Sequence, residues 1–218
     1  MSTARRATSQ RWIDLGEQQR EAVARAVVDL VSEGRVPLKV AELADRAGIT
    51  RPTLYKYFPT LGAAVLHTAQ TLLAELDQYV RPRLPKHANA RELLLARFEV
   101  SFRYARSKPE MTRFFSYYDF AFRRSGLSND ENAVRGAISH SAGHPFIDLF
   151  KTGQTEGSID PDLQPDVTFL AMVTSMTGTA QRLLVEDNWT SGTDRRAEGV
   201  HQMMIDIWRR KLTPKDAK

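Results

Sequence analysis

Apolar residues recur every three or four positions along almost the whole chain, and this spacing limits the possible folds more than any other feature. No stretch of the 218 residues combines strict alternation of apolar and polar residues with the turn signals of a hairpin. We therefore expect an all-α fold. Besides two short helices between residues 39 and 58, the spacing predicts helices over residues 17–32, 60–80, 90–107, 109–123, 130–155, 164–188 and 193–211.

Composition indicates a globular chain and argues against several classes of protein. With 218 residues, of which 42% are hydrophobic, the chain can bury a core in one or two domains. No apolar run approaches the roughly 18 residues of a membrane span, and the opening MSTARRATSQRW lacks the apolar middle of a secretory signal. The absence of cysteine removes disulfides and thiolate metal sites. We expect a cytoplasmic protein with no membrane partner and no cofactor.

The charge balance permits an anionic partner without establishing one. The chain has 31 Lys and Arg residues against 26 Asp and Glu residues, which gives a net charge of +5. An excess of this size is compatible with nucleic acid binding but does not require it. The partner therefore has to be inferred from motifs.

The stretch KVAELADRAGITRPTLYKYF at residues 39–58 has the spacing of a helix-turn-helix. Ala44 is small enough for two helices to cross closely, and Gly48 closes the first helix in a left-handed conformation at low cost. Thr50 is a suitable N-cap for the second helix. Leu54 and Phe58 lie four residues apart and form the buried stripe of that helix.

The outward positions of the second short helix carry hydrogen-bonding side chains. Arg51 and Thr53 stand at the helix start, which is the part that reaches base edges when such a helix enters a major groove. The basic and aromatic residues that follow suit phosphate oxygens. The alternative is a surface helix whose rings lie on neighbouring elements. We predict a DNA-binding set made of Lys39, Thr50, Arg51, Pro52, Thr53, Tyr55, Lys56 and Tyr57.

With these residues in place, the segment LKVAELADRAGITRPTLYKYFPTLGAAVLHTA resembles the DNA-binding domain of the TetR family of transcriptional regulators. Gly48, the ITRPT turn, the Leu54-Tyr55 pair and the Tyr57-Phe58 end follow the family pattern in order and without gaps, and the likeness covers about residues 17–70. The resemblance implies an N-terminal three-helix helix-turn-helix domain over residues 17–62. It also implies a C-terminal helical ligand-binding and dimerisation domain over residues 63–218.

One position departs from the family pattern. The family commonly has a basic residue just after the recognition helix, whereas this chain has Leu61, followed by Gly62 in place of an acidic or polar residue. One phosphate contact expected from the family is therefore in doubt, and Lys39 and Lys56 are available to compensate for it.

The segment before the first predicted helix, residues 1–16, is expected to be a flexible basic arm. It carries Arg5, Arg6 and Arg11, which suit phosphates or a minor groove. The alternative is a disordered tail without a DNA contact, with Trp12 packed on the domain.

Aromatic residues are concentrated between residues 98 and 122. Met111, Phe115, Tyr118 and Phe122 form a stripe at intervals of four, three and four residues, which is usual for a helix core and also suits the wall of an apolar cavity. By resemblance, the family places a small-molecule pocket among these middle helices. The predicted ligand-binding set is Phe98, Phe102, Met111, Phe115, Tyr118, Phe122, His140, His144, Met172 and Met176.

The run ISHSAGHPFIDLF sets His140, His144 and Asp148 four residues apart, so an unbroken helix would place them on one face. A metal ion suits such a trio, but Gly143 and Pro145 predict a kink that would turn Asp148 away from the histidines. Hydrogen bonding of an effector by either histidine, or a polar face turned to solvent, explains the residues equally well. We predict no metal site.

Two late helices carry apolar stripes suited to self-association. The first presents Leu170 beside Phe169 and small residues such as Gly178, and a repressor needs two recognition helices about one DNA turn apart. The alternative is that each stripe is buried within its own subunit. The predicted homodimer interface consists of Phe169, Val173, Val200, Met203, Met204, Ile207 and Trp208.

We therefore predict a ligand-responsive transcriptional regulator. It is expected to act as a repressor that binds a palindromic operator as a dimer and is released by a small hydrophobic or aromatic effector. We expect no enzyme, because the chain lacks a helix-embedded pairing of nucleophile, acid and base outside the ambiguous 140–148 run. The competing hypothesis is a helical ligand-binding or adaptor protein that has lost specific DNA binding, and Leu61 is its only support.

Overall fold

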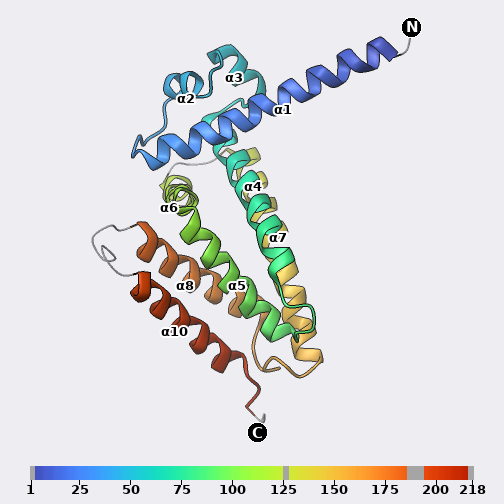
Figure 1. The fold of residues 1–218 in the computed structure, drawn as a ribbon, viewed down its shortest axis with the longest axis vertical. Coiled ribbons are helices and arrows are strands. Elements are labelled where there is room, and N and C mark those ends of the chain that lie inside the picture. Colours follow the sequence, from blue (N-terminus) through green and yellow to red (C-terminus); the bar gives the residue numbers. More distant parts are fainter. Residues whose placement is uncertain (1–2, 125–127, 186–193, 216–218) are drawn as a thin grey trace. The chain divides into compact units, whose positions relative to one another are not determined.

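The computed structural model describes residues 3–124, 128–185 and 194–215, and the regular structure in these ranges is helical throughout (Figure 1). The all-α prediction is confirmed. The helices are α1 (Thr3–Ser32), α2 (Val40–Arg46), α3 (Arg51–Tyr57), α4 (Leu61–Val80), the short 3₁₀ helix η1 (Arg81–Arg83), α5 (Ala90–Ser107), α6 (Pro109–Arg124), α7 (Asn129–Thr155), α8 (Pro165–Val185) and α10 (Asp194–Leu212). None of these described helices is long and apolar enough to cross a membrane.

The first of two compact units comprises Met1–Leu72 and Tyr117–Val134. Its core forms where α2 and α3 lie along the C-terminal half of α1 (Figure 1). Val23 and Val27 of α1, together with Leu43 of α2, are completely buried there. Burial of this apolar surface holds two seven-residue helices that are too short to be stable in isolation.

The first helix begins at Thr3 instead of near residue 17, so residues 3–16 of the predicted arm are helical and continuous with that helix. The segment contains no proline, and Gly16 lies inside the helix. A Cβ on Gly16 would lie 3.6 Å from ring atom Cε1 of Tyr57, which is an ordinary van der Waals contact, so the approach of α3 does not require a glycine here. The side chains of Arg5, Arg6, Arg11 and Trp12 lie outside the described residues.

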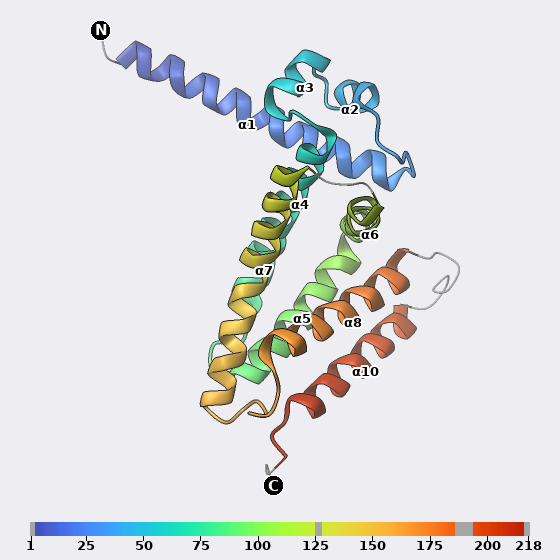
Figure 2. The same cartoon turned by 180° about the vertical axis from the view of Figure 1, so that it is seen from behind.

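The second unit comprises Leu73–Ser116 and Arg135–Lys218, and in it α5, α8 and α10 run side by side (Figure 2). Phe150 of α7, Met172 of α8 and Ile205 of α10 are completely buried in one apolar cluster with Leu94 and Leu95 of α5. Large interior side chains from four helices thus form the core of this unit.

Most helix boundaries agree with the predictions to within one or two residues. The range 90–107 is reproduced, and α6 and α7 each differ by one residue at one end. For the helix predicted to end at residue 188, the last residues lie outside the described part. The compact units divide the chain differently from the predicted boundary between residues 62 and 63, since the first unit extends to Leu72 and includes Tyr117–Val134.

Candidate nucleic-acid interface

The turn between α2 and α3 has the backbone geometry that the motif requires. Gly48 has a φ of +67°, which L side chains rarely adopt. The backbone N–H of Ile49 donates to the carbonyl of Ala44 at 3.0 Å and closes the end of α2. Ala44 is only 3% exposed. A small side chain at the crossing therefore lets α3 pack closely on α2.

Helix α3 is held by a cap at its start and by two apolar anchors. Thr50 accepts a hydrogen bond from the backbone N–H of Thr53 at 3.3 Å, and Pro52 stands in the first turn, where a missing N–H does no harm. Leu54 and Phe58 are both buried. These contacts fix the rotation of α3 about its own axis and so determine which side chains point outward.

The outward face of α3 presents Arg51, Tyr55 and Lys56. All three side chains are exposed, and Tyr55 is 50% exposed despite its large ring. Within the described part of the chain, Arg51 and Lys56 form no ion pair. Arg51 also borders an open groove of about 450 Å³, which α2 lines with Glu42 and Asp45. Two unpaired cations and a phenol on one short helix form a surface suited to the edges and phosphates of DNA.

Tyr57 and Lys39 are less free than the predicted DNA-binding role requires. The ring of Tyr57 is half-buried against α1, with the guanidinium of Arg20 5.6 Å from its centroid. The ammonium of Lys39 lies 3.6 Å from a carboxylate oxygen of Glu42, which also pairs with Arg35 at 3.1 Å. Hydrogen bonding to Arg35 lowers the pKa of Glu42, so this carboxylate remains charged. A DNA contact by Lys39 would have to compete with it.

Helix α2 is tied to the end of α1 by a bidentate ion pair. Both terminal nitrogens of Arg46 lie 2.7 Å from the carboxylate oxygens of Glu33. The hydrogen bond from Arg46 lowers the pKa of Glu33, so the pair stays charged at neutral pH. Planar pairs of this kind fix orientation as well as distance, and this one positions the helix that supports α3.

Comparison with known proteins identifies the same segment. The family model described as bacterial regulatory proteins, tetR family, matches residues 32–60, which contain α2, the turn and α3. No curated protein matches the chain in sequence.

Solved structures resemble the chain over most of its length. A TetR family transcription regulator from Marinobacter aquaeolei VT8 has 19% identity and a TM-score of 0.66, with 94% of this chain and 100% of the other covered. The ketosteroid transcriptional regulator KstR2 of Mycobacterium tuberculosis has 21% identity and a TM-score of 0.62, with 90% and 95% covered. FadR from Bacillus subtilis, in complex with stearoyl-CoA, has 13% identity and a TM-score of 0.64, with 90% and 98% covered. At these identities the likeness is one of fold.

Residues 32–60 therefore match the TetR family model, and the chain as a whole has the fold of solved TetR-family regulators. Regulators of the TetR family bind operator DNA and small-molecule effectors, and they are generally not enzymes. The fold of this chain is that of a TetR-family transcription regulator, with α3 in the place of the recognition helix.

Residues predicted to bind an effector lie mostly in the interior of the second unit. Phe98 packs against the core cluster, and its ring centroid is 5.8 Å from that of Phe146. Met172 and Met176 belong to the cluster itself. Met111 is buried in α6. Packing in the core accounts for much of the apolar spacing from which these residues were predicted, without a ligand. Their role in effector binding stays a prediction.

The remaining aromatic residues of the predicted set are divided between the two units. Phe115 belongs to the second unit and meets Phe114 edge-on at 5.3 Å, whereas Tyr118 belongs to the first unit. The side chain of Phe122 lies outside the described residues. The predicted stripe of Met111, Phe115, Tyr118 and Phe122 is therefore not one continuous surface. Its residues are divided between two compact units.

The predicted polar trio on α7 is only partly described. Nδ1 of His144 lies 2.9 Å from a carboxylate oxygen of Asp148, and both side chains are more than half exposed. The side chain of His140 lies outside the described residues. The helix continues through Pro145, so the two described members of the trio remain one turn apart.

The predicted dimer residues separate into an exposed set and an inward-facing set. Trp208 donates from Nε1 to the hydroxyl of Ser175 at 2.9 Å, and Met204 packs against the core cluster. Phe169 contacts Phe146 within the same unit at 5.0 Å. The exposed apolar side chains of these two helices are Val167, Leu170, Val200, Met203 and Ile207. Of these, Val167 was missed by the sequence reading, and Leu170 was noted but left out of the predicted set.

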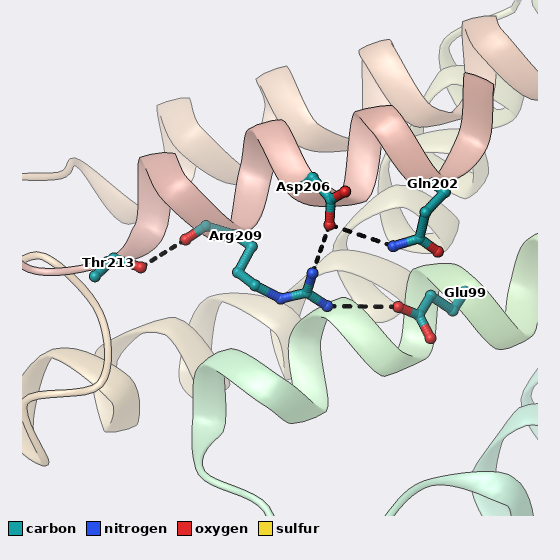
Figure 3. Close-up of polar contacts among 5 residues, drawn as sticks. All are labelled: Glu99, Gln202, Asp206, Arg209 and Thr213. Atoms are coloured by element: carbon teal, nitrogen blue, oxygen red, sulfur yellow. Dashed lines mark hydrogen bonds and ion pairs between the residues drawn. The ribbon is translucent and has the colours of Figure 1, made fainter. Parts of the chain in front are cut away.

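A group of polar contacts on α10 includes one ion pair to α5 (Figure 3). The guanidinium of Arg209 lies 2.6 Å from Asp206 and 3.8 Å from Glu99 of α5, while the amide of Gln202 donates to Asp206 at 3.3 Å. These surface contacts orient α10 on α5, but the buried apolar cluster contributes most of the stability.

Proposed function

We propose that the protein is a ligand-responsive transcriptional repressor that binds a palindromic operator as a homodimer. The supporting observation is the outward face of α3, where Arg51, Tyr55 and Lys56 are exposed while Leu54 and Phe58 anchor the helix. Arg51 and Lys56 form no ion pair among the described residues, although the ammonium of Lys56 lies 5.5 Å from the ring centroid of Tyr57, so both cations can meet DNA phosphates or base edges. Such a repressor acts where the DNA is, in the cytoplasm.

The effector is proposed to be a small hydrophobic or aromatic molecule bound in the second unit. One solved relative in fold is in complex with stearoyl-CoA, which carries a long apolar acyl chain, and another is described as a ketosteroid transcriptional regulator, a name that refers to largely apolar molecules. The aromatic and methionine side chains of α5, α6 and α8 provide apolar surface for such a molecule.

Release from DNA is proposed to follow from differential affinity. Helix α4 carries residues of both units, so a ligand that favours one conformation of the second unit can bias the first. A ligand that binds the DNA-free form about 100-fold more tightly shifts the equilibrium by about 2.7 kcal/mol. Operator DNA must then weaken effector binding by the same factor.

The dimer is proposed to form through the exposed apolar face of α8 and α10. Leu170 is 66% exposed and Met203 is 64% exposed, and the other members of this face are Val167, Val200 and Ile207. Large apolar side chains grouped on two adjacent helices are typical of an interaction surface. A two-fold axis through this face pairs the two recognition units, as a palindromic site requires.

Substitution of α3 residues tests the DNA-binding role. Arg51→Ala is expected to cost about 1 to 3 kcal/mol on the operator and much less on random DNA, because it removes a base-edge contact. Lys56→Ala is expected to weaken both complexes and to reduce the salt slope by about one unit, because it removes a phosphate contact. Fluorescence anisotropy with both duplexes at several salt concentrations measures these effects. Equal losses on the two duplexes for Arg51→Ala would rule out base reading.

A ligand-binding or adaptor protein without specific DNA binding is the second candidate. Two observations favour it: Leu61 replaces the basic residue common in the family, and the carboxylate of Glu131 lies at the start of α4. Absence of salt-dependent binding to the DNA upstream of its own gene would establish this candidate over the repressor.

A further inference from the structure

Glu131, in the first turn of α7, connects that helix to the start of α4 within the first unit. Its Oε1 accepts a hydrogen bond from the hydroxyl of Thr60 at 2.5 Å. Its Oε2 accepts from the backbone N–H and the hydroxyl of Ser128, each at 3.0 Å, while its own backbone N–H donates to Ser128 Oγ at 3.2 Å. The carboxylate thus completes a capping box on α7 and contacts α4 at the same time.

Gly62 leaves the space that this carboxylate occupies. A Cβ at residue 62 would overlap Oε1 of Glu131 and would lie 2.9 Å from its Cδ. The glycine has no positive φ, so the backbone conformation does not call for it. A side chain at residue 62 would therefore push the Glu131 carboxylate, the end of a flexible side chain, away from its contact with Thr60.

The carboxylate is placed next to the recognition helix. Phe58 is the C-cap of α3, and Thr60 follows two residues later, accepting from the backbone N–H of Ala63 to cap α4. The hydrogen bond from Thr60, with those from Ser128, lowers the pKa of Glu131. The side chain therefore carries a negative charge at neutral pH, and this charge contacts Thr60, which follows Lys56 and Tyr57 by a few residues along the chain.

We infer that Glu131 limits the affinity of the recognition unit for DNA. A fixed carboxylate at the start of α4, which directly follows α3 in the chain, repels phosphates near that helix start. It opposes the sequence-independent part of the binding energy, which comes from neutralising phosphates. Binding then depends more heavily on base contacts made from α3. This inference rests on the proposed DNA-binding function.

The test is Glu131→Gln. Glutamine can still cap α7 and accept from Thr60, so only the charge is lost. On a random-sequence duplex, the variant is expected to bind about fivefold more tightly than the wild-type protein, with a salt slope steeper by about 0.9. Fluorescence anisotropy of the full chain across a salt series gives both quantities, and a thermal melt confirms folding.

Asp130→Asn is the matched control. Asp130 is exposed in the same turn of α7 and carries the same charge. Asp130→Asn is expected to change the affinity for the random-sequence duplex by less than about twofold. The reason is that no described contact fixes the Asp130 carboxylate against α4, so solvent and salt screen its charge. Equal gains for both variants would attribute the effect to net charge and overturn the inference.

Gly62→Ala is the second variant. Its added methyl group displaces the carboxylate from Thr60 without changing the net charge, and a smaller gain in DNA affinity is expected. Unchanged affinity in both Glu131→Gln and Gly62→Ala would refute the role of Glu131. If the wild-type protein itself shows no salt-dependent DNA binding, the proposed function fails, and the inference fails with it.

Discussion

Replacing Met203 and Ile207 together with glutamate is expected to leave the protein monomeric and its core intact. The two side chains are 64% and 48% exposed on α10, so their substitution removes little packing within the subunit. A two-fold interface would contain each new carboxylate twice, and burying unpaired charges is costly. We expect the dimer dissociation constant to rise at least about 100-fold, which corresponds to about 2.7 kcal/mol. Sedimentation velocity measures the change.

The choice of residues matters for this experiment. Met204 was also predicted for the interface, but it packs against the core cluster, so a charge there would test folding instead of association. Val36→Glu combined with Val134→Glu is the matched control, because these residues are 46% and 40% exposed in the other unit. A dimer that persists in the Met203 and Ile207 variant would show that this face is not the interface.

Acid is expected to destabilise the protein through His201. This residue is 3% exposed, both of its ring nitrogens lack a partner among the described residues, and its ring stacks on Phe102 at 3.8 Å. Burial lowers the pKa of His201 to about 4 from its usual 6.5, although the carboxylate of Glu198 acts in the opposite direction. The folded state therefore favours the neutral ring, whereas the unfolded chain takes up a proton once the pH falls below 6.5.

The free energy of unfolding should therefore fall as the pH drops through the interval between these two values. The contribution of His201 to this loss is about 3 kcal/mol by about pH 4. His201→Leu removes the titrating group. The drop in unfolding free energy between neutral pH and about pH 4 should then be smaller than in the wild-type protein by about 3 kcal/mol. Urea unfolding at a series of pH values and one fixed protein concentration measures it.

His87→Leu is the control for the acid experiment, because it makes the same chemical change at an exposed histidine of the same unit. Its pH profile should follow that of the wild-type protein. If His201→Leu also follows the wild-type profile, the buried imidazole does not account for acid sensitivity.

The helix-turn-helix could be predicted from sequence because its determinants are local. Gly48, Thr50, Leu54 and Phe58 each act on neighbours within a few residues, through a left-handed turn, a cap and an i,i+4 stripe. Helix limits elsewhere were predictable for the same reason, since apolar periodicity and terminating residues are read along the chain. Proline and glycine were the least certain signals: Gly16 lies within α1, and α7 continues through Pro145.

Periodicity could not separate inward-facing from outward-facing residues on the late helices. Met203 and Met204 are adjacent in an apolar stripe, yet only Met203 is exposed, because the packing of α10 on α5 and α8 sets the rotation of the helix. The same holds for the aromatic run, where Tyr118 and Phe115 belong to different compact units. A stripe shows that a helix has an apolar side but does not specify its neighbour.

The sequence by itself determined the helical class, most helix limits and the helix-turn-helix motif of this protein, because these depend on interactions between residues close in the chain. Only the tertiary structure placed Glu131 on Thr60, 71 residues away, and brought the ring of His201 onto Phe102. It also showed that the Glu131 carboxylate occupies the space where a side chain at residue 62 would begin. Contacts between distant segments depend on how whole helices pack, and no local pattern of residue types encodes which side chains then meet.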